Sequence, residues 1–281
     1  MQKGMKVTSP LSESLVLPTQ ANFVKQGRGE PVVMIHGLAA SYHDWDDLIP
    51  ELVSHGYAAF ALDLLGHGES PKPPVRTYRI DWVFDHLSGW IDSLHLDRPP
   101  VVIGHSLGGY LALEYALRFP ERVRALVLVD PFYCHGQLPP LLRMSYRRPA
   151  IHTAVVKWTP SWLLRMIIDA SSLSMGHSNA GAHNLSARVR AQTALDYKRT
   201  APGVYHLPNS MVDLSPRLSE IRQPSLVVWG THDPTLAPAS FLDLVSLLPN
   251  VSAKSLPAGH VPHQSLPNQF NDMVLDFLKT L

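Results

Sequence analysis

The sequence predicts an α/β fold in which a mostly parallel sheet is covered on both faces by helices. Short β-branched and apolar runs alternate with helical patterns in the first half of the chain, and the alternation resumes near its end. The runs are apolar on both faces, as strands buried between two layers of helices are. With 281 residues, 45% of them hydrophobic and 17% charged, the chain can bury a large core.

The first half supplies most of the expected elements in order. A hairpin-like pair of strands is predicted over residues 14–17 and 22–26, and buried strands over 31–35, 58–62, 100–103 and 125–129. Apolar residues three and four positions apart predict helices between them, over residues 45–53, 78–94 and 107–119. Gly56 and Pro120 are typical helix stops after the first and third of these.

The last part of the chain continues the pattern with strands over residues 225–229 and 253–256 and helices over 241–248 and 270–281. Residues 134–213 break it, because they lack a clean strand. They hold nine Lys or Arg and three acidic residues, which gives this stretch a net charge of +6. The rest of the chain therefore has a net charge of −5. We therefore expect a core domain of residues 1–133 and 214–281, and a helical cap or lid of residues 134–213.

Composition excludes several classes of protein. The formal net charge of +1 provides no field for nucleic acid, and no apolar run reaches the length of a membrane span. Residues 1–20 lack an apolar stretch followed by a cleavage site, and Cys134 is the only cysteine, so we expect a cytoplasmic protein without disulfides. The fifteen histidines show no H-E-x-x-H pattern, so neither a metal nor another cofactor is expected.

The sharpest motif is Gly104-His105-Ser106-Leu107-Gly108, with a predicted strand before it and a helix after it. At such a turn the serine backbone is strained and its hydroxyl stands clear of the sheet. Glycines two positions before and after it are needed, because a Cβ there would collide across the turn. A serine hydroxyl also needs a base to take its proton and an acid to orient that base.

Two downstream strand ends offer these partners in the order serine, acid, histidine. Asp233 follows the strand over residues 225–229, and His260 follows the short strand over 253–256. Asp130, at the end of another strand, is an alternative acid, and His232 and His263 are rival bases. Upstream, a backbone N–H after His36-Gly37, together with that of Leu107, can receive the negative oxygen of a tetrahedral intermediate.

In order and spacing, these motifs resemble those of the α/β-hydrolase fold superfamily. The likeness rests on His36-Gly37, the Asp63 to Ser70 turn, the serine motif, Gly230 to Asp233 and Gly259-His260, and covers residues 20–133 and 214–281. It implies an eight-stranded sheet, Ser106 as nucleophile, Asp233 as acid, His260 as base, and Leu38 and Leu107 as oxyanion donors. Ser265 stands where many relatives carry an acidic residue.

The resemblance favours acyl chemistry, because epoxide hydrolases and haloalkane dehalogenases of this fold carry aspartate where this chain has Ser106. We expect a serine hydrolase acting on a small carboxylic ester or related acyl substrate. A carbon–carbon bond hydrolase is the alternative, although such enzymes commonly carry a glycine-rich stretch where this chain has Leu38 to Ser41. A ligand receptor that keeps the same residues without useful turnover is a further alternative.

The expected cap contains an apolar stripe at helical spacing, comprising Trp158, Trp162, Leu163, Met166 and Ile167. We predict that Trp158, Trp162 and Met166 line the acyl pocket beneath the cap. The basic residues of the cap also allow peripheral contact with an anionic membrane surface.

Overall fold

The computed structural model describes residues 20–146 and 185–281, together with residues 154, 158–160, 162, 163, 165 and 166. Within these residues seven strands form one sheet in the order β1-β3-β2-β4-β5-β6-β7. β1 is antiparallel to β3, and the other neighbouring pairs are parallel. The predicted mostly parallel sheet is confirmed. Of the eight strands expected, seven are seen, and the strand predicted over residues 14–17 lies outside the described residues.

The strands agree with the apolar runs to within two residues at each end. They are β1 (Phe23–Gly27), β2 (Glu30–Ile35), β3 (Tyr57–Leu62), β4 (Val101–His105), β5 (Ala125–Val129), β6 (Ser225–Gly230) and β7 (Val251–Leu256). Four of them, β2 to β5, are almost entirely buried, which explains why they are apolar on both faces.

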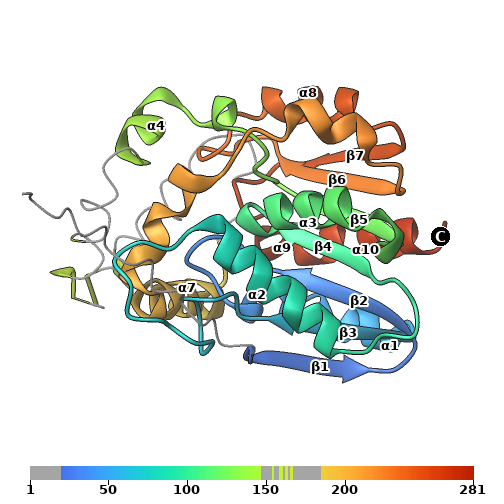
Figure 1. Cartoon of the computed structure of the whole chain (residues 1–281), viewed down its shortest axis with the longest axis horizontal. Coiled ribbons are helices and arrows are strands. Elements are labelled where there is room, and N and C mark those ends of the chain that lie inside the picture. The colour runs from blue at the N-terminus through green and yellow to red at the C-terminus, as the bar shows by residue number, and fades with distance from the viewer. Residues whose placement is uncertain (1–19, 147–153, 155–157, 161, 164, 167–184) are drawn as a thin grey trace, which may run out of the picture.

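Helices cover both faces of the sheet (Figure 1). One apolar layer joins the sheet to α2 (Ile80–Ser93), α3 (Leu107–Arg118) and α8 (Ala239–Leu247), and includes Val33 and Val102. The other joins it to α1 (Ile49–Ser54) and α10 (Pro267–Leu278), and includes Val32 and Val101. Consecutive strand residues therefore enter opposite layers, as the period of two requires.

The helix predicted over residues 45–53 is two separate elements. A 3₁₀ turn, η1 (Tyr42–Trp45), precedes α1, which carries Pro50 in its first turn. Proline fits the first turn of a helix, where its missing N–H costs nothing, and so it marks a new start rather than a continuation. Gly56 follows with a positive φ of 83°, in agreement with its expected role as a stop.

The described part of residues 134–213 contains α4 (Pro140–Tyr146), α7 (Ala187–Arg199) and the 3₁₀ segment η4 (Pro202–Ser210), and no strand. In Figure 1, α4 and α7 lie on the left, across the sheet from the carboxyl terminus of the chain. None of the described helices is both long and apolar enough to cross a bilayer.

Candidate active site

Ser106 occupies a sharp turn between β4 and α3. Its φ of 51° and ψ of −110° lie outside the regions that a serine normally adopts. A Cβ on Gly104 would lie 2.2 Å from the carbonyl oxygen of Gly108, so the close approach across this turn requires glycine. Such strain is held in place by the surrounding structure, and here it presents the hydroxyl beyond the end of the sheet.

His260 lies between β7 and the short helix α9 (Pro262–Ser265), and its ring contacts the two other predicted residues. His260 Nε2 lies 3.0 Å from Ser106 Oγ, and Nδ1 lies 2.7 Å from Asp233 Oδ2. A carboxylate oxygen can only accept, so Nδ1–H donates to Asp233 and the Nε2 lone pair accepts from the serine hydroxyl. The structure thus brings Ser106, Asp233 and His260 together in an arrangement that can move a proton off the hydroxyl.

Backbone hydrogen bonds continue the sheet beyond its strand ends and hold these segments side by side. Ser106 N–H donates to the Val129 carbonyl at 3.0 Å, and Thr231 N–H donates to the Leu256 carbonyl at 2.9 Å. Because parallel strands end at one edge of the sheet, residues far apart in sequence converge there.

The Asp233 carboxylate is ionised and held in one orientation. Its side chain is fully buried, and Oδ1 accepts the N–H groups of Thr235 at 2.7 Å and Leu236 at 3.1 Å. Burial, the largest influence, would raise the pKa of Asp233, but the charge and hydrogen bond of His260 and the two backbone donors together lower it.

Asp130, the alternative acid, is not hydrogen-bonded to His260. Its Oδ1 accepts the N–H of Gly230 at 2.9 Å, and its buried Oδ2 has no hydrogen-bond partner in the described structure. Burial, together with the nearby charge of Asp233, raises the pKa of Asp130 well above its ordinary value. A raised pKa favours the neutral carboxyl, which cannot stabilise an imidazolium as an ionised one does. The geometry and the directions of the two pKa shifts therefore both favour Asp233.

The rival histidines do not contact the serine. His232 is exposed, and its Nδ1 lies 3.1 Å from the Thr231 hydroxyl. His263 is buried, and its ring centroid lies 4.9 Å from that of Trp45. In the described structure the Ser106 hydroxyl donates to His260.

Leu38 and Leu107 lie beside Ser106 and line the same cavity. The α3 helix packs closely on the end of β2, since a Cβ on Gly108 would lie 2.1 Å from the carbonyl oxygen of Ile35. Leu107 is the first residue of α3, so its N–H has no partner within the helix. This placement is compatible with the predicted oxyanion donors, and their role remains a prediction.

The cavity beside Ser106 is small and apolar, with a volume of about 40 Å³. One water needs about 10–15 Å³ on the same measure, so the space suits a group of a few non-hydrogen atoms. Among the described residues its lining contains no charged side chain. The lining consists of Ser106, Leu38, Leu107, Phe132, Leu138, Leu207, Pro208, Met211, Thr235 and Leu236.

Trp158, Trp162 and Met166, the predicted pocket wall, are not among these lining residues. Their exposed fractions are 77%, 69% and 53%. Ile167, which completes the predicted stripe, lies outside the described residues. The apolar wall is formed instead by residues after β5 and β6 and by η4. A contribution of the three side chains to substrate binding therefore stays a prediction.

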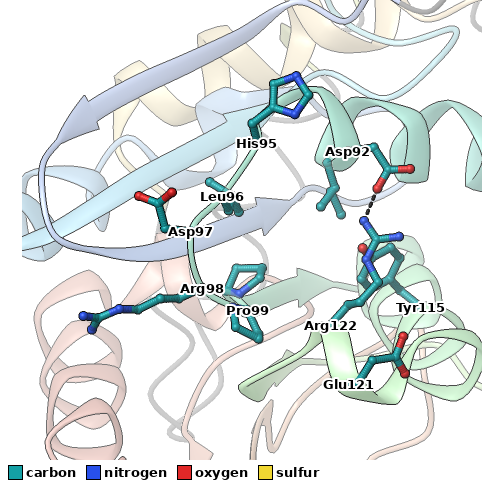
Figure 2. Close-up of a pocket in the computed structure, with 11 residues that line it drawn as sticks. Asp92, His95, Leu96, Asp97, Arg98, Pro99, Tyr115, Glu121 and Arg122 are labelled. Carbon is teal, nitrogen blue, oxygen red and sulfur yellow. Dashed lines mark hydrogen bonds and ion pairs between the residues drawn. The ribbon is translucent and has the colours of Figure 1, made fainter.

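A larger pocket, of about 260 Å³, lies elsewhere (Figure 2). Asp92, His95, Pro100 and Arg122 are among its lining residues, and Arg122 is ion-paired with Asp92. Pro100 immediately precedes β4, whereas Ser106 follows it, and a five-residue strand spans about 17 Å. The pocket therefore lies at the opposite end of this strand from Ser106.

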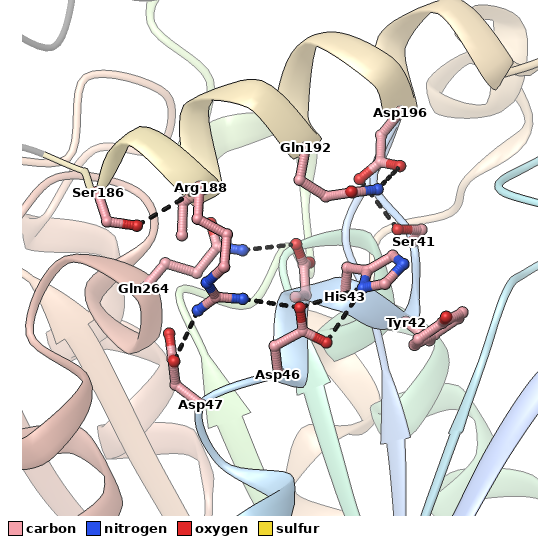
Figure 3. Close-up of polar contacts among 12 residues, drawn as sticks. Ser41, Tyr42, His43, Asp46, Asp47, Ser186, Arg188, Gln192, Asp196 and Gln264 are labelled. Carbon is pink, nitrogen blue, oxygen red and sulfur yellow. Dashed lines mark hydrogen bonds and ion pairs between the residues drawn. The ribbon is translucent and has the colours of Figure 1, made fainter.

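Polar contacts attach α7 to residues 41–47 of the core (Figure 3). The Arg188 guanidinium donates to Asp46 Oδ2 at 2.7 Å and to Asp47 Oδ1 at 2.6 Å. Near the other end of the helix, the Ser41 hydroxyl donates to Asp196 Oδ2 at 2.9 Å. Burial raises the pKa of Asp196 to about 7.

Two groups of side chains place possible metal-ligand atoms within 4.8 Å of one another in the described residues. They are Asp130, Asp233 and His260, and Asp44, His105 and His263. The first group contains the ionised carboxylate and base described above, whose facing atoms are already hydrogen-bonded. In the second, Asp44 contacts His105. The expectation that no metal is needed remains a prediction.

The sequence did not point to Asp44, His105 or most of the cavity lining. Phe132 and Leu236 follow buried strands, so the rule that sites form at strand ends could have identified them. Nothing in the local sequence marks Met211 as part of the cavity lining, because its position depends on how η4, which ends just before it, folds back over the sheet.

Comparisons with known proteins agree with this architecture. The family model of the alpha/beta hydrolase fold matches residues 30–264. The chain is 31% identical to the 2-hydroxy-6-oxononadienedioate/2-hydroxy-6-oxononatrienedioate hydrolase of Paraburkholderia xenovorans, over 92% of this chain and 90% of that protein.

Solved structures with similar folds have different activities. A thermophilic esterase from Thermogutta terrifontis has a TM-score of 0.75 and 23% identity, over 92% of this chain and 93% of that one. A meta-cleavage product hydrolase from Pseudomonas fluorescens has a TM-score of 0.70 and 23% identity, over 92% and 94%. At this level of identity the likeness concerns the fold alone.

Proposed function

Because this chain belongs to the alpha/beta hydrolase fold family, we propose that it is a serine hydrolase that cleaves carboxylic esters with a short acyl group. The observation that carries the proposal is the hydrogen-bonded series Ser106–His260–Asp233 beside a small apolar cavity. An ionised acid, a correctly oriented base and a strained serine are what nucleophilic attack on a carbonyl requires.

In the proposed reaction, Ser106 Oγ attacks the ester carbonyl while its proton passes to His260 Nε2. The backbone N–H groups of Leu38 and Leu107 donate to the oxyanion. The Nε2 proton then goes to the leaving alkoxide, and the acyl group stays on Ser106. His260 next takes a proton from water, and the water oxygen attacks the acyl carbon. That proton then passes from Nε2 to Ser106 Oγ as the Oγ–acyl bond breaks and the carboxylic acid leaves. Asp233 stabilises the imidazolium in both halves.

The cavity supports the choice of an acyl group. An acyl chain bound there would be buried against apolar side chains, and each buried methylene contributes about 0.8 kcal/mol to binding. About 40 Å³ suits an acetyl or butyryl chain better than a long fatty acid. We therefore expect the ratio kcat/KM to be highest for short acyl esters.

Residues 134–213 form a cap over this site in our proposal. Support comes from η4, which contributes Leu207 and Pro208 to the cavity lining, and from α7, which is tied to residues 41–47 of the core. Hydrogen bonds between segments this distant in sequence are what a cap seated on the catalytic edge requires. Peripheral contact with an anionic membrane through its exposed tryptophans remains a prediction.

A carbon–carbon bond hydrolase is the second candidate, favoured by the printed activity of the relative from Paraburkholderia xenovorans. The substrate in that name is a dicarboxylate. Burying a carboxylate is costly unless a cation pairs with it. The described lining offers none, and Arg188 is paired with Asp46 and Asp47. Within the described residues, the uncharged lining therefore favours an ester over a dicarboxylate.

Turnover assays separate the candidates. Wild-type protein is assayed with p-nitrophenyl acetate, butyrate and octanoate, and with a 2-hydroxy-6-oxo-dienoate followed by loss of its absorbance. The Ser106→Ala variant is the control in every assay. Ester turnover that disappears in the variant supports the proposal, and serine-dependent cleavage of the dienoate alone supports the second candidate. Binding without turnover of either supports a receptor.

A fluorophosphonate probe tests the nucleophile independently of the substrate. We expect the adduct on the peptide that contains Ser106, at a rate that falls to background in Ser106→Ala. Labelling that persists unchanged in this variant refutes the assignment.

A further inference from the structure

His105, the residue before the proposed nucleophile, contacts the loop that carries the proposed base. Its Nε2 lies 2.8 Å from the backbone carbonyl oxygen of His260. Its Nδ1 lies 3.4 Å from Asp44 Oδ2. The His105 and Asp44 side chains are only 5% and 8% exposed. One buried ring therefore connects the serine turn, the histidine loop and η1.

The chemistry of the carbonyl contact fixes its direction. A carbonyl oxygen can only accept, so Nε2–H of His105 donates to His260. The Asp44 carboxylate lies on the other side of the ring, with Oδ2 3.4 Å from Nδ1. Both side chains are buried, so the ring is held between two fixed neighbours.

Asp44 is held firmly enough to orient this ring. Its Oδ1 accepts from the Gln264 amide at 3.1 Å, and its Oδ2 accepts from Gly37 N–H at 3.3 Å. Burial would raise the pKa of Asp44, but its hydrogen bond and charge interaction with His105 and the nearby rings of His263 and His36 lower it to about 2. The carboxylate is therefore ionised at neutral pH.

We propose that His105, oriented by Asp44, is a positioning residue that fixes the main chain of His260 relative to Ser106. The inference rests on the proposed function. Asp233 restrains the ring of His260, whereas His105 restrains its backbone. Because His105 and Ser106 are adjacent in the chain, this contact ties the base directly to the segment that carries the nucleophile.

Such a restraint matters for the rate because misplacing a reacting group by about 1 Å can reduce activity about 10²-fold. The Nε2–Oγ distance of 3.0 Å is short enough for proton transfer. Loss of the His105 donor would free the His260 backbone without removing any group that touches the substrate. The predicted defect is therefore in kcat, with KM little changed.

Two amide variants test this division of roles, because each keeps a nitrogen at one of the two ring positions. The amide nitrogen of Gln occupies the place of His Nε2, and that of Asn occupies the place of His Nδ1. We expect His105→Asn to lower kcat and the fluorophosphonate labelling rate of Ser106 by about 10²-fold. His105→Gln keeps the donor to His260, so we expect it to stay within about tenfold of wild type.

The same two substitutions at the exposed His232 are the matched control, because His232 has no contact with Ser106 or His260 in the described structure. They should leave kcat and labelling unchanged. Thermal unfolding of every variant separates a loss of fold from a loss of position. If His105→Asn does not fold, Asp44→Asn serves instead, and we expect it to lower kcat at unchanged KM.

Each result has a distinct meaning. Equal losses in folded His105→Asn and His105→Gln, or no loss in either, overturn the positioning role. An unchanged kcat in Asp44→Asn overturns the part assigned to Asp44. If the wild-type protein neither labels at Ser106 nor turns over esters, the proposed function itself is refuted. This outcome is distinct from failure of the positioning role, because it is seen in the wild-type protein without any variant.

Discussion

Replacing Asp233 by Asn should abolish most activity because of how the structure holds that side chain. Asp233 Oδ1 accepts two backbone N–H groups, from Thr235 and Leu236, while Oδ2 accepts from His260. An Asn amide has one oxygen and one NH₂ group. Its oxygen must remain with the two backbone donors, so the NH₂ group is turned toward His260 Nδ1.

This orientation forces the wrong tautomer on the base. His260 Nδ1 must then accept, so the proton resides on Nε2, which can no longer take a proton from Ser106. The same change in another serine hydrolase lowers kcat about 10⁴-fold. That factor corresponds to about 5.4 kcal/mol of transition-state stabilisation. We expect a loss of this order in Asp233→Asn, with KM largely retained.

The assay is hydrolysis of p-nitrophenyl butyrate, with thermal unfolding as the check on the fold. Asp130→Asn is the matched control, since the raised pKa of Asp130 favours its neutral form and Asn keeps an oxygen for the Gly230 N–H. We expect it to stay within about tenfold of wild type. A greater loss in Asp130→Asn than in Asp233→Asn would refute the assignment of the acid.

Three further predictions concern the cavity, the serine turn and α7. Met211→Ala should raise kcat/KM for octanoate relative to acetate esters by enlarging the cavity, whereas Leu242→Ala, at an exposed position of α8, should not, and equal shifts would contradict this reasoning. Gly104→Ala should lower Tm sharply because its Cβ would collide with backbone, while Gly89→Ala, with open space around it, should raise stability by about 0.5–1 kcal/mol. The pKa of Asp196 is raised to about 7 in the folded protein, so the folded state keeps a proton that the unfolded state releases above about pH 4. The free energy of unfolding should therefore fall by about 1.4 kcal/mol per pH unit between about pH 4 and about pH 7. Thermal unfolding of Asp196→Asn should lack this decline, and a parallel pH dependence in both proteins would show that Asp196 is not its source.

The parts of the fold that the sequence predicts are those set by local pattern. Parallel strands are apolar on both faces, so β2 to β5 stand out without knowledge of their neighbours. The serine turn is equally local, because two glycines and a strained residue are needed within five positions. The prediction of one helix over residues 45–53 was wrong, and the reason is also local. Pro50 lies in the first turn of a separate helix, although the apolar pattern runs on without a break.

The parts that could not be predicted depend on contacts between distant segments. Asp130 and Asp233 both follow buried strands, and only the hydrogen bonds of Gly230, Thr235 and Leu236 decide which carboxylate faces His260. The cavity wall could not be predicted for the same reason. Apolar residues of η4 carry no local signature, and the sequence instead favoured the more conspicuous tryptophans, which the structure leaves exposed.

The segment over residues 36–47 links the cap to the chemistry in the proposed enzyme. Leu38, at one end, lies beside Ser106, and Asp44 lies against His105, which holds the His260 backbone. The same segment is hydrogen-bonded to α7. Ser41 donates to Asp196, and Asp46 and Asp47 accept from Arg188. Displacement of α7 therefore acts on the segment that orients both the oxyanion site and the base. Weakening the α7 contacts should thus lower kcat even though no residue of α7 lines the described cavity.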